Sequence, residues 1–421
     1  MRLRLFLGAL VLLLSGCVPS PSDKQTLRFW VMGREGEVVA QLLPEFERRN
    51  PGIRVRLQQL PWTAAHEKLL TAFAGDTLPD LSQLGNTWVP ELAALHALVD
   101  LDSHVAASRG VVAEDYFPGI WNTNVIDGRL YGIPWYVDTR LLFYRRDLLE
   151  QAGFQTPPRS WAEWQRALAA IKQEVGPARY AILLPLNEPE PLLALALQQG
   201  DPLLRDEGRW GGFASPGFRR ALDFYARMFR NGWAPTLGGA QISNVWTEFG
   251  RGYFTFYVSG PWNIEEFKRR LPPERQADWM TAPLPGPGGL GVSTAGGASL
   301  VIFRSSRHPQ AAWRLIEYLS EPAVQAQFHA VSGNLPPRRT AWRDERLAGN
   351  QYAKAFRDQL ERVRPTPKIP EWERIATEMQ GMAEQVVRGE MDVDQATQTL
   401  DRRVDGMLKK RRWLLTRGAS S

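Results

Sequence analysis

The sequence predicts an α/β protein with more than one lobe, built on doubly wound sheets flanked by helices. Along the first hundred residues, buried strand patterns alternate with helical patterns, which is the order typical of a parallel sheet. The chain has 421 residues, too many for a single hydrophobic core. In such sheets a ligand binds beyond the carboxyl ends of the strands, so we expect the site there.

The first set of elements begins with a buried strand at 26–32. A glycine-containing loop at 33–36 follows, and then a helix from about 37 to 49 that contains Pro44, which should kink it or fall near its first turn. The alternation continues with a half-exposed strand at 53–57, a helix at 64–75, a strand at 81–84 and a helix from Trp88.

A second set of elements follows Tyr136, with a strand at 139–145. The sequence from Ser160 to Glu163 is a capping box and predicts the start of a helix that runs to about 174. The remaining predicted elements are a helix after Ser215-Pro216, a strand at 253–258, a helix opening at 260–262, a strand at 299–303, two helices divided near 320–322, and a mostly helical region from 351 onward.

The N-terminus has the pattern of a bacterial export signal. Arg2 and Arg4 precede a short apolar run, which ends in Leu-Ser-Gly-Cys at 14–17. This tetrad resembles a lipobox, in which the cysteine is acylated and the chain is cut before it. A transmembrane anchor would need about 20 apolar residues, more than this run has. The other alternative is an ordinary signal peptide with an incidental cysteine.

We therefore predict a signal peptide at 1–16, a Pro/Ser-rich tether at 17–25, and lipidation of Cys17, the single cysteine of the chain. The expected location is the periplasmic side of a membrane, or the outer face of the cell in a single-membrane bacterium. Contact with the membrane would be through the lipid anchor only.

Composition and motifs exclude several function classes. The net charge is +6, and two of the positive charges, on Arg2 and Arg4, belong to the predicted signal peptide. A net charge of this size is too small to indicate nucleic-acid binding. The five histidines show no metal-ligand spacing, so we expect no metal. The G-x-G-x-x-G match at 286–291 is followed by neither a helix nor an acidic residue, and we expect no cofactor. The basic run 409–412 beside Trp413 favours a solvated helix end over a membrane contact.

The most informative stretch is 127–168. It holds the following residues in a characteristic order and spacing: Gly128, Tyr131, Gly132, Pro134, Asp138, Tyr144, Gly153, Pro157, Pro158, Ser160, Trp161 and Glu163. In these residues the chain resembles the extracellular solute-binding proteins of ABC importers, specifically the sugar-binding family that includes maltose-binding protein. Similar segments at 85–92, 256–262, 293–302, 306–328, 333–338 and 370–375 extend the resemblance over nearly the whole chain. Arg145, where the family usually has Asn, is a departure from the pattern.

The resemblance implies a two-lobed periplasmic-binding-protein fold with three hinge crossings and closure of the lobes around a ligand. The implied crossings lie near 135–138, 283–287 and 335–342. One lobe would hold 26–135 plus 288–336, and the other 139–282 plus 340–421.

A sugar site needs aromatic platforms and polar groups for hydroxyls. Arg34 and Glu35 follow the first strand, and Asn86 and Thr87 follow the third, so all four should face the crevice. Asp138 is a further candidate, because it matches the family's sugar-binding carboxylate. Trp262 and Trp372 match the family's stacking aromatics, and Tyr136 offers a third ring. Gly296 and Gly297 would allow close backbone approach, and Arg338 is the weakest choice.

Each candidate has a structural alternative. Trp262 and Trp372 would otherwise be core residues, Arg34 and Glu35 a solvated pair, and Asp138 a turn cap. Trp88 is assigned chiefly to packing, although it could reach the cleft.

The function that these observations predict is the lipid-anchored substrate-binding subunit of an ABC importer. It would capture a small oligosaccharide, such as the disaccharides maltose or trehalose, and deliver it as a monomer to the permease without catalysis. The alternatives are another solute, such as a glycerophosphodiester or a polyamine, and a cell-surface glycoside hydrolase or lyase using Glu35 and Asp138. A chemoreceptor adaptor would have the same fold.

Overall fold

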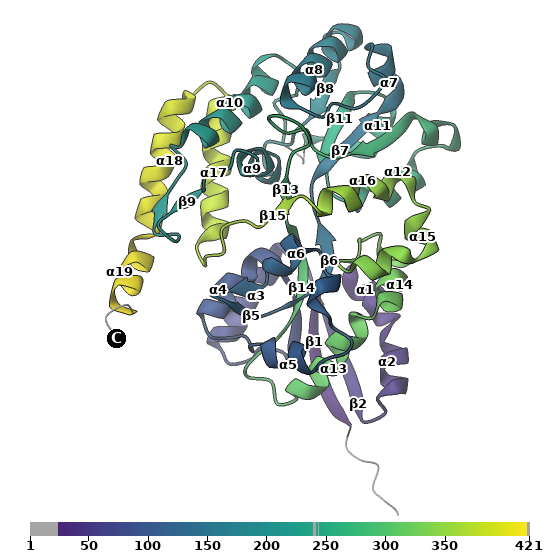
Figure 1. The fold of residues 1–421 in the computed structure, drawn as a ribbon, viewed down its shortest axis with the longest axis vertical. Coiled ribbons are helices and arrows are strands. Elements are labelled where there is room, and N and C mark those ends of the chain that lie inside the picture. Colours follow the sequence, from purple (N-terminus) through teal and green to yellow (C-terminus); the bar gives the residue numbers. More distant parts are fainter. Residues whose placement is uncertain (1–23, 239–240, 243, 419–421) are drawn as a thin grey trace, which may run out of the picture.

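The computed structural model describes residues 24–238, 241–242 and 244–418, and it folds into two lobes, each around one main sheet (Figure 1). The predicted signal peptide and Cys17 lie outside these residues. In the described part, no helix is long and apolar enough to cross a membrane.

The sheet of the first lobe has the order β2-β1-β3-β14-β6. Strand β1 pairs in parallel with β2 and β3, as the alternating pattern predicts, whereas β14 returns from far along the chain and pairs antiparallel with β3 and β6. The strand bounds are β1 (Gln25–Met32), β2 (Ile53–Leu60), β3 (Leu81–Gly85), β6 (Ile133–Asp138) and β14 (Gly296–Ile302).

The helix expected at 37–49 is two helices, α1 (Glu35–Ala40) and α2 (Leu43–Arg49). Pro44 lies in the first turn of α2, where a missing backbone N–H costs nothing, so the chain breaks before it rather than kinking. The other helices of this lobe are α3 (Trp62–Ala74), α4 (Val89–Ala94), α5 (Asp102–Ala107), α6 (Pro118–Asn122), α13 (Pro309–Leu319) and α14 (Pro322–Ser332), with 3-10 turns at Asn86–Trp88 and Ala113–Asp115.

The sheet of the second lobe has the order β12-β7-β11-β8, with β11 parallel to β8 and antiparallel to β7. Its strands are β7 (Leu141–Arg145), β8 (Tyr180–Leu183), β11 (Phe254–Ser259) and β12 (Trp279–Ala282). Its helices are α7 (Arg146–Gln151), α8 (Trp161–Val175), α9 (Glu190–Leu197), α10 (Pro216–Arg230), α11 (Val245–Gly250), α12 (Asn263–Arg270), α15 (Glu345–Ala348), α16 (Gln351–Leu360), α17 (Trp372–Val387), α18 (Val393–Met407) and α19 (Lys409–Gly418), with 3-10 turns at Pro273–Asp278 and Arg339–Arg343.

The predicted capping box is present at the start of α8, where Ser160 accepts from the backbone N–H of Glu163 and the Glu163 side chain bonds back. Three short two-stranded ladders complete the fold: β4 (Val125–Ile126) with β5 (Arg129–Leu130), β9 (Leu204–Arg205) with β10 (Trp210–Gly211), and β13 (Ser293–Thr294) with β15 (Val363–Arg364).

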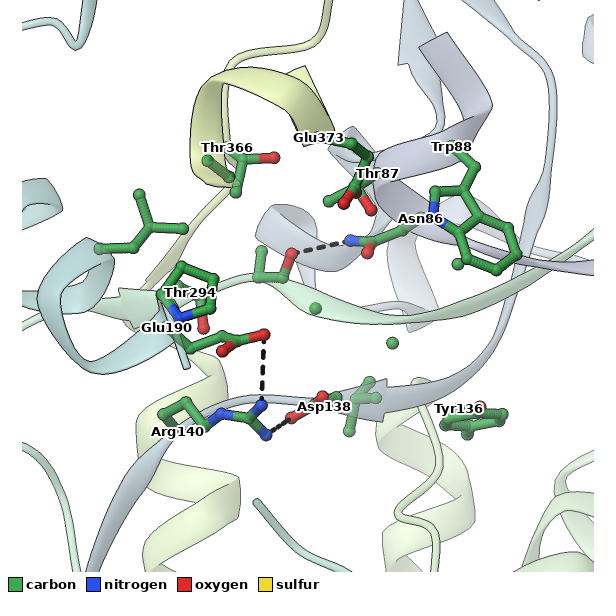
Figure 2. Close-up of a pocket in the computed structure, with 18 of the residues that line it drawn as sticks. Asn86, Thr87, Trp88, Tyr136, Asp138, Arg140, Glu190, Thr294, Thr366 and Glu373 are labelled. Carbon is green, nitrogen blue, oxygen red and sulfur yellow. Dashed lines mark hydrogen bonds and ion pairs between the residues drawn. The ribbon is translucent and has the colours of Figure 1, made fainter. Parts of the chain in front are cut away.

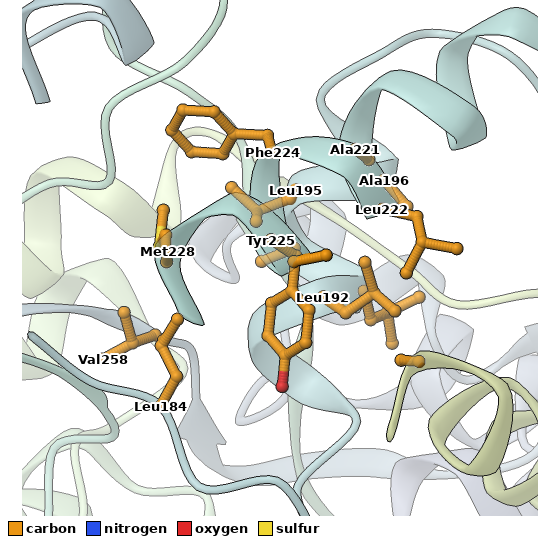
Figure 3. Close-up of a cluster of buried hydrophobic side chains, with 14 of the residues drawn as sticks. Leu184, Leu192, Leu195, Ala196, Ala221, Leu222, Phe224, Tyr225, Met228 and Val258 are labelled. Atoms are coloured by element: carbon orange, nitrogen blue, oxygen red, sulfur yellow. The ribbon is translucent and has the colours of Figure 1, made fainter. Parts of the chain in front are cut away.

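Each lobe has its own apolar core. In the second lobe, α9 and α10 pack through leucines and aromatic rings, including Leu192, Leu222 and Tyr225 (Figure 3). Trp161 stacks on Phe224 with ring centroids 4.2 Å apart, so it contributes to the packing of this lobe.

The chain passes between the two sheets from β6 to β7 and again from β12 to β14. Near the first passage, the backbone N–H of Val137 donates to Leu335 O at 2.9 Å, which places the segment after α14 beside β6. The connecting segments thus lie side by side, and they border the space between the lobes.

Candidate functional site

A cavity of about 550 Å³ lies between the two lobes, within the usual size of a small-molecule site. Both lobes line it, as Figure 2 shows for part of the set. Its lining residues are Glu35, Trp62, Gly85, Asn86, Thr87, Trp88, Tyr136, Val137, Asp138, Arg140, Pro189, Glu190, Leu193, Trp262, Thr294, Ala295, Gly296, Gly297, Asn334, Thr366, Trp372, Glu373 and Ala376.

The first lobe contributes polar groups that follow its strands. Asn86 lies in the turn after β3, and its Nδ2 donates to Ala295 O at 2.8 Å. The Tyr136 hydroxyl accepts from Gln83 at 2.9 Å. Glu35, at the start of α1, accepts from the Asn334 amide at 2.9 Å. These hydrogen bonds hold the wall of the first lobe in one geometry.

Gly296 and Gly297 line the cavity, but the neighbouring strand is what requires them to be glycine. A Cβ on Gly297, whose φ is +133°, would lie 2.2 Å from Tyr136 O. A Cβ on Gly296 would lie 2.5 Å from Asp138 O. The close approach of β6 therefore requires glycine at both positions, and their contact with a ligand stays a prediction.

The central charged group is Arg140, in the turn between β6 and β7. Its guanidinium donates to Asp138 Oδ1 at 2.9 Å and lies 3.5 Å from Glu190 Oε1 on α9 (Figure 2). Burial raises the pKa of the Asp138 carboxyl, and the charge of Arg140 opposes that rise. Arg140 thus lies between a carboxylate at the end of β6, in the sheet of the first lobe, and a carboxylate on α9 of the second lobe.

The guanidinium of Arg140 also lies 4.7 Å from the centroid of the Trp262 ring, a cation–π contact. Trp262 is 37% exposed, while Trp372, the first residue of α17, is only 2% exposed. Trp262 therefore has surface to offer a ligand. Trp372 lines the cavity but is buried in the core of the second lobe, which was the structural alternative for this residue.

Two tryptophans of the first lobe also line the cavity, Trp62 and Trp88, with ring centroids 5.5 Å apart in an edge-on arrangement. Trp88 lines the cavity, a position that the sequence left open beside its packing role. Trp62 was not predicted, although it follows β2 at the carboxyl end of the sheet, the same position relative to a strand as Glu35 and Asn86. Arg140, two residues from Asp138, was not predicted either, nor was Glu190, for which the sequence carries no signal.

Two candidates lie elsewhere. Arg34 lines a smaller adjoining cavity of about 280 Å³, together with Glu35 and Trp262, and donates to Val331 O at 3.2 Å. Arg338 is buried away from the site, where it donates to Asp115 at 2.7 Å and to two backbone carbonyls, Gly110 O and Ser320 O. The prediction that Arg338 binds the ligand is corrected here, because every one of these hydrogen bonds is internal to the fold.

The cavity is more acidic than the candidate residues suggested. Four carboxylates line it, on Glu35, Asp138, Glu190 and Glu373, against one cation, Arg140. Carboxylates accept hydrogen bonds from hydroxyl and ammonium groups and repel anions. The arrangement suits a neutral or cationic solute and disfavours a phosphodiester. In the described part of the chain, no group of three or more His, Cys, Asp or Glu side chains could hold a metal ion.

Comparison with known proteins agrees with this architecture. The family model of bacterial extracellular solute-binding proteins matches residues 32–326. The solved structure of the sugar-binding protein MalE from Xanthomonas citri is 59% identical, with a TM-score of 0.91 over 93% of this chain and 99% of that one.

More distant relatives match at nearly full length. A putative binding protein of Brucella abortus is 26% identical over 90% of this chain and 91% of its own. The diacetylchitobiose binding protein DasA of Streptomyces coelicolor is 23% identical over 92% of this chain and 90% of its own. These are binding proteins rather than enzymes. The chain therefore belongs to the bacterial extracellular solute-binding proteins.

Proposed function

We propose that this protein captures a small oligosaccharide, most simply a disaccharide such as maltose or trehalose, in the cavity between its lobes. The observation that carries the proposal is the composition of the cavity wall. It combines an exposed indole on Trp262 with carboxylate and amide groups from Asp138, Glu190 and Asn86. A pyranose ring presents apolar CH faces to an aromatic ring and hydroxyls to planar polar groups, so these residues match both of its surfaces.

The likeness to MalE of Xanthomonas citri, a sugar-binding protein, supports the same solute class. The bound sugar would then pass to the permease of an ABC importer, with the protein acting as a monomer. Lipidation of Cys17 would tether the chain to the membrane and raise its effective concentration at the permease. Replacing Cys17 by Ser should move the protein from the membrane fraction to the soluble fraction.

The proposal is tested by thermal unfolding of the mature chain with mono-, di- and trisaccharides. A ligand at 100 times its dissociation constant stabilises by about 2.7 kcal/mol, which raises the melting temperature measurably. We expect a disaccharide to give the largest shift, and Trp262→Ala to reduce that shift strongly. Trp210→Ala is the matched control, because Trp210 is also 37% exposed but lies outside the cavity.

A second candidate is a cationic solute such as a polyamine, which the four carboxylates of the cavity favour. The same screen therefore includes spermidine and putrescine, with glycerophosphocholine as the phosphodiester. A shift with a polyamine and none with any saccharide would replace the proposed sugar by an amine.

A further inference from the structure

Helix α19 (Lys409–Gly418), the last described element, carries charge that solute binding does not use. The sequence from 409 to 418 holds five basic residues and no acidic residue. Figure 1 shows the helix at the edge of the second lobe, on the opposite side of the molecule from α12. It therefore adds a local positive patch to an exposed edge.

Two arginines fix α19 against the lobe. Arg412 donates to Arg209 O at 2.9 Å and to Asp405 O at 2.8 Å, and its guanidinium lies 3.9 Å from the ring centroid of Trp210. Arg411 turns toward the body of the lobe, where it lines a second cavity. Because these two side chains point inward, the orientation of the helix is set, and so is the face that it turns outward.

The outward face consists of Lys409, Lys410, Trp413 and Leu414, which we call the α19 face. Positions i, i+1, i+4 and i+5 lie on one side of a helix. Trp413 is 52% exposed and Leu414 is 50% exposed, the highest values among the large apolar side chains of the described residues. Two lysines thus border an indole and a leucine on one fixed surface.

Contrary to the expectation of a solvated helix end and of membrane contact through the lipid anchor only, we propose that the α19 face rests on an anionic phospholipid surface. Lysines interact with acidic headgroups, and exposed Trp and Leu side chains beside them can enter the boundary between headgroups and acyl chains. The charge argues for this occupant, because α19 has no carboxylate of its own to neutralise its lysines. The contact would fix the orientation of the tethered protein at the membrane, and it does not depend on which solute the cavity binds.

The test measures binding of residues 18–421, without acyl chains, to vesicles of equal parts phosphatidylglycerol and phosphatidylcholine. We expect sedimentation with these vesicles, loss of binding as the salt concentration rises, and no binding to phosphatidylcholine alone. Lys409→Gln with Lys410→Gln should weaken binding about thirtyfold, at roughly 1 kcal/mol for each charge. Trp413→Ser with Leu414→Ser should weaken it as well.

The matched control removes the same charge from α12. Lys268→Gln with Arg269→Gln should leave vesicle binding unchanged, because those cations pair with Glu265 and Glu266. Equal loss in both charge variants would overturn the proposal, as would equal binding to neutral vesicles. If the α19 variants impaired solute uptake by cells while vesicle binding stayed normal, the face would dock on a protein and the membrane assignment would be wrong. Unchanged melting temperatures confirm that the variants fold.

Discussion

The two walls of the interlobe cavity hold their polar groups in different ways. On the first lobe, Asn86, Tyr136 and Glu35 each have a neutral partner within the same lobe, so the wall keeps its geometry without a ligand. From the end of β6 to the second lobe, Arg140 lies between the carboxylates of Asp138 and Glu190 and against the ring of Trp262. These charged groups can also hydrogen-bond to the hydroxyls of a ligand.

The difference indicates two roles within one cavity. The wall of the first lobe is part of the fold, so its residues contribute to both stability and affinity. Trp262 contributes mainly to affinity, because its ring is 37% exposed and belongs to no core cluster of the second lobe. The following predictions test this division, beginning outside the cavity with a residue that should contribute to stability alone.

Arg338→Ala should lower the free energy of unfolding by about 3–5 kcal/mol, because it removes the buried cation of this pair and leaves the partly buried Asp115 carboxylate without it. The dissociation constant for the solute should not change in the folded protein. Chemical denaturation and calorimetric titration measure the two quantities. Arg388→Ala is the control, since its pair with Glu384 is exposed and contributes about 0–1 kcal/mol. A large loss of affinity in Arg338→Ala would return this residue to the site.

Trp262→Ala should weaken solute binding by about 2 kcal/mol or more, because the exposed indole is the ring that a ligand can cover. Stability should change little, since no core cluster of the second lobe contains this side chain. Titration calorimetry on the variant and on Trp210→Ala separates stacking from general loss of an indole. Equal affinities in both variants would contradict the proposed role.

Asn86→Ala should affect both quantities, which distinguishes the wall of the first lobe. Without the amide, the buried Ala295 carbonyl loses its partner, at a cost of about 1–3 kcal/mol in unfolding free energy. Affinity should fall too, because the cavity loses a positioned polar group. If denaturation showed full stability together with lost affinity, the two walls would not differ as described.

The smallest effect concerns His66, which packs behind the first wall with its ring 5.1 Å from that of Trp88. A hydrogen bond from the His66 ring to the Glu91 carboxylate raises the pKa of His66 above its usual value of 6.5, so the charge on His66 stabilises the fold below that pH. This contribution is lost as the pH rises through the raised value. The melting temperature of the wild type relative to His66→Gln should therefore decline between about pH 6 and about pH 8. A constant difference would show that His66 keeps one charge state throughout.

Local sequence patterns predicted much of the fold and part of the cavity. The strand and helix alternation predicted the parallel pairing of β1 with β2 and β3, and strand ends predicted Glu35, Asn86 and Thr87 at the cavity. The antiparallel position of β14 was not predictable from pattern, because it depends on a return of the chain from about 200 residues away.

By itself, the sequence determined the family, through motif residues at fixed spacing, and the residues that follow the strands, because chain direction places them at one edge of a sheet. Tertiary structure alone decided the electrostatics of the cavity. Arg140 meets Glu190 only because α9 packs beside the turn after β6, and Arg338 is directed to Asp115 rather than to a ligand. Burial and ion pairing depend on which distant segments pack together, and no local pattern of residues specifies that.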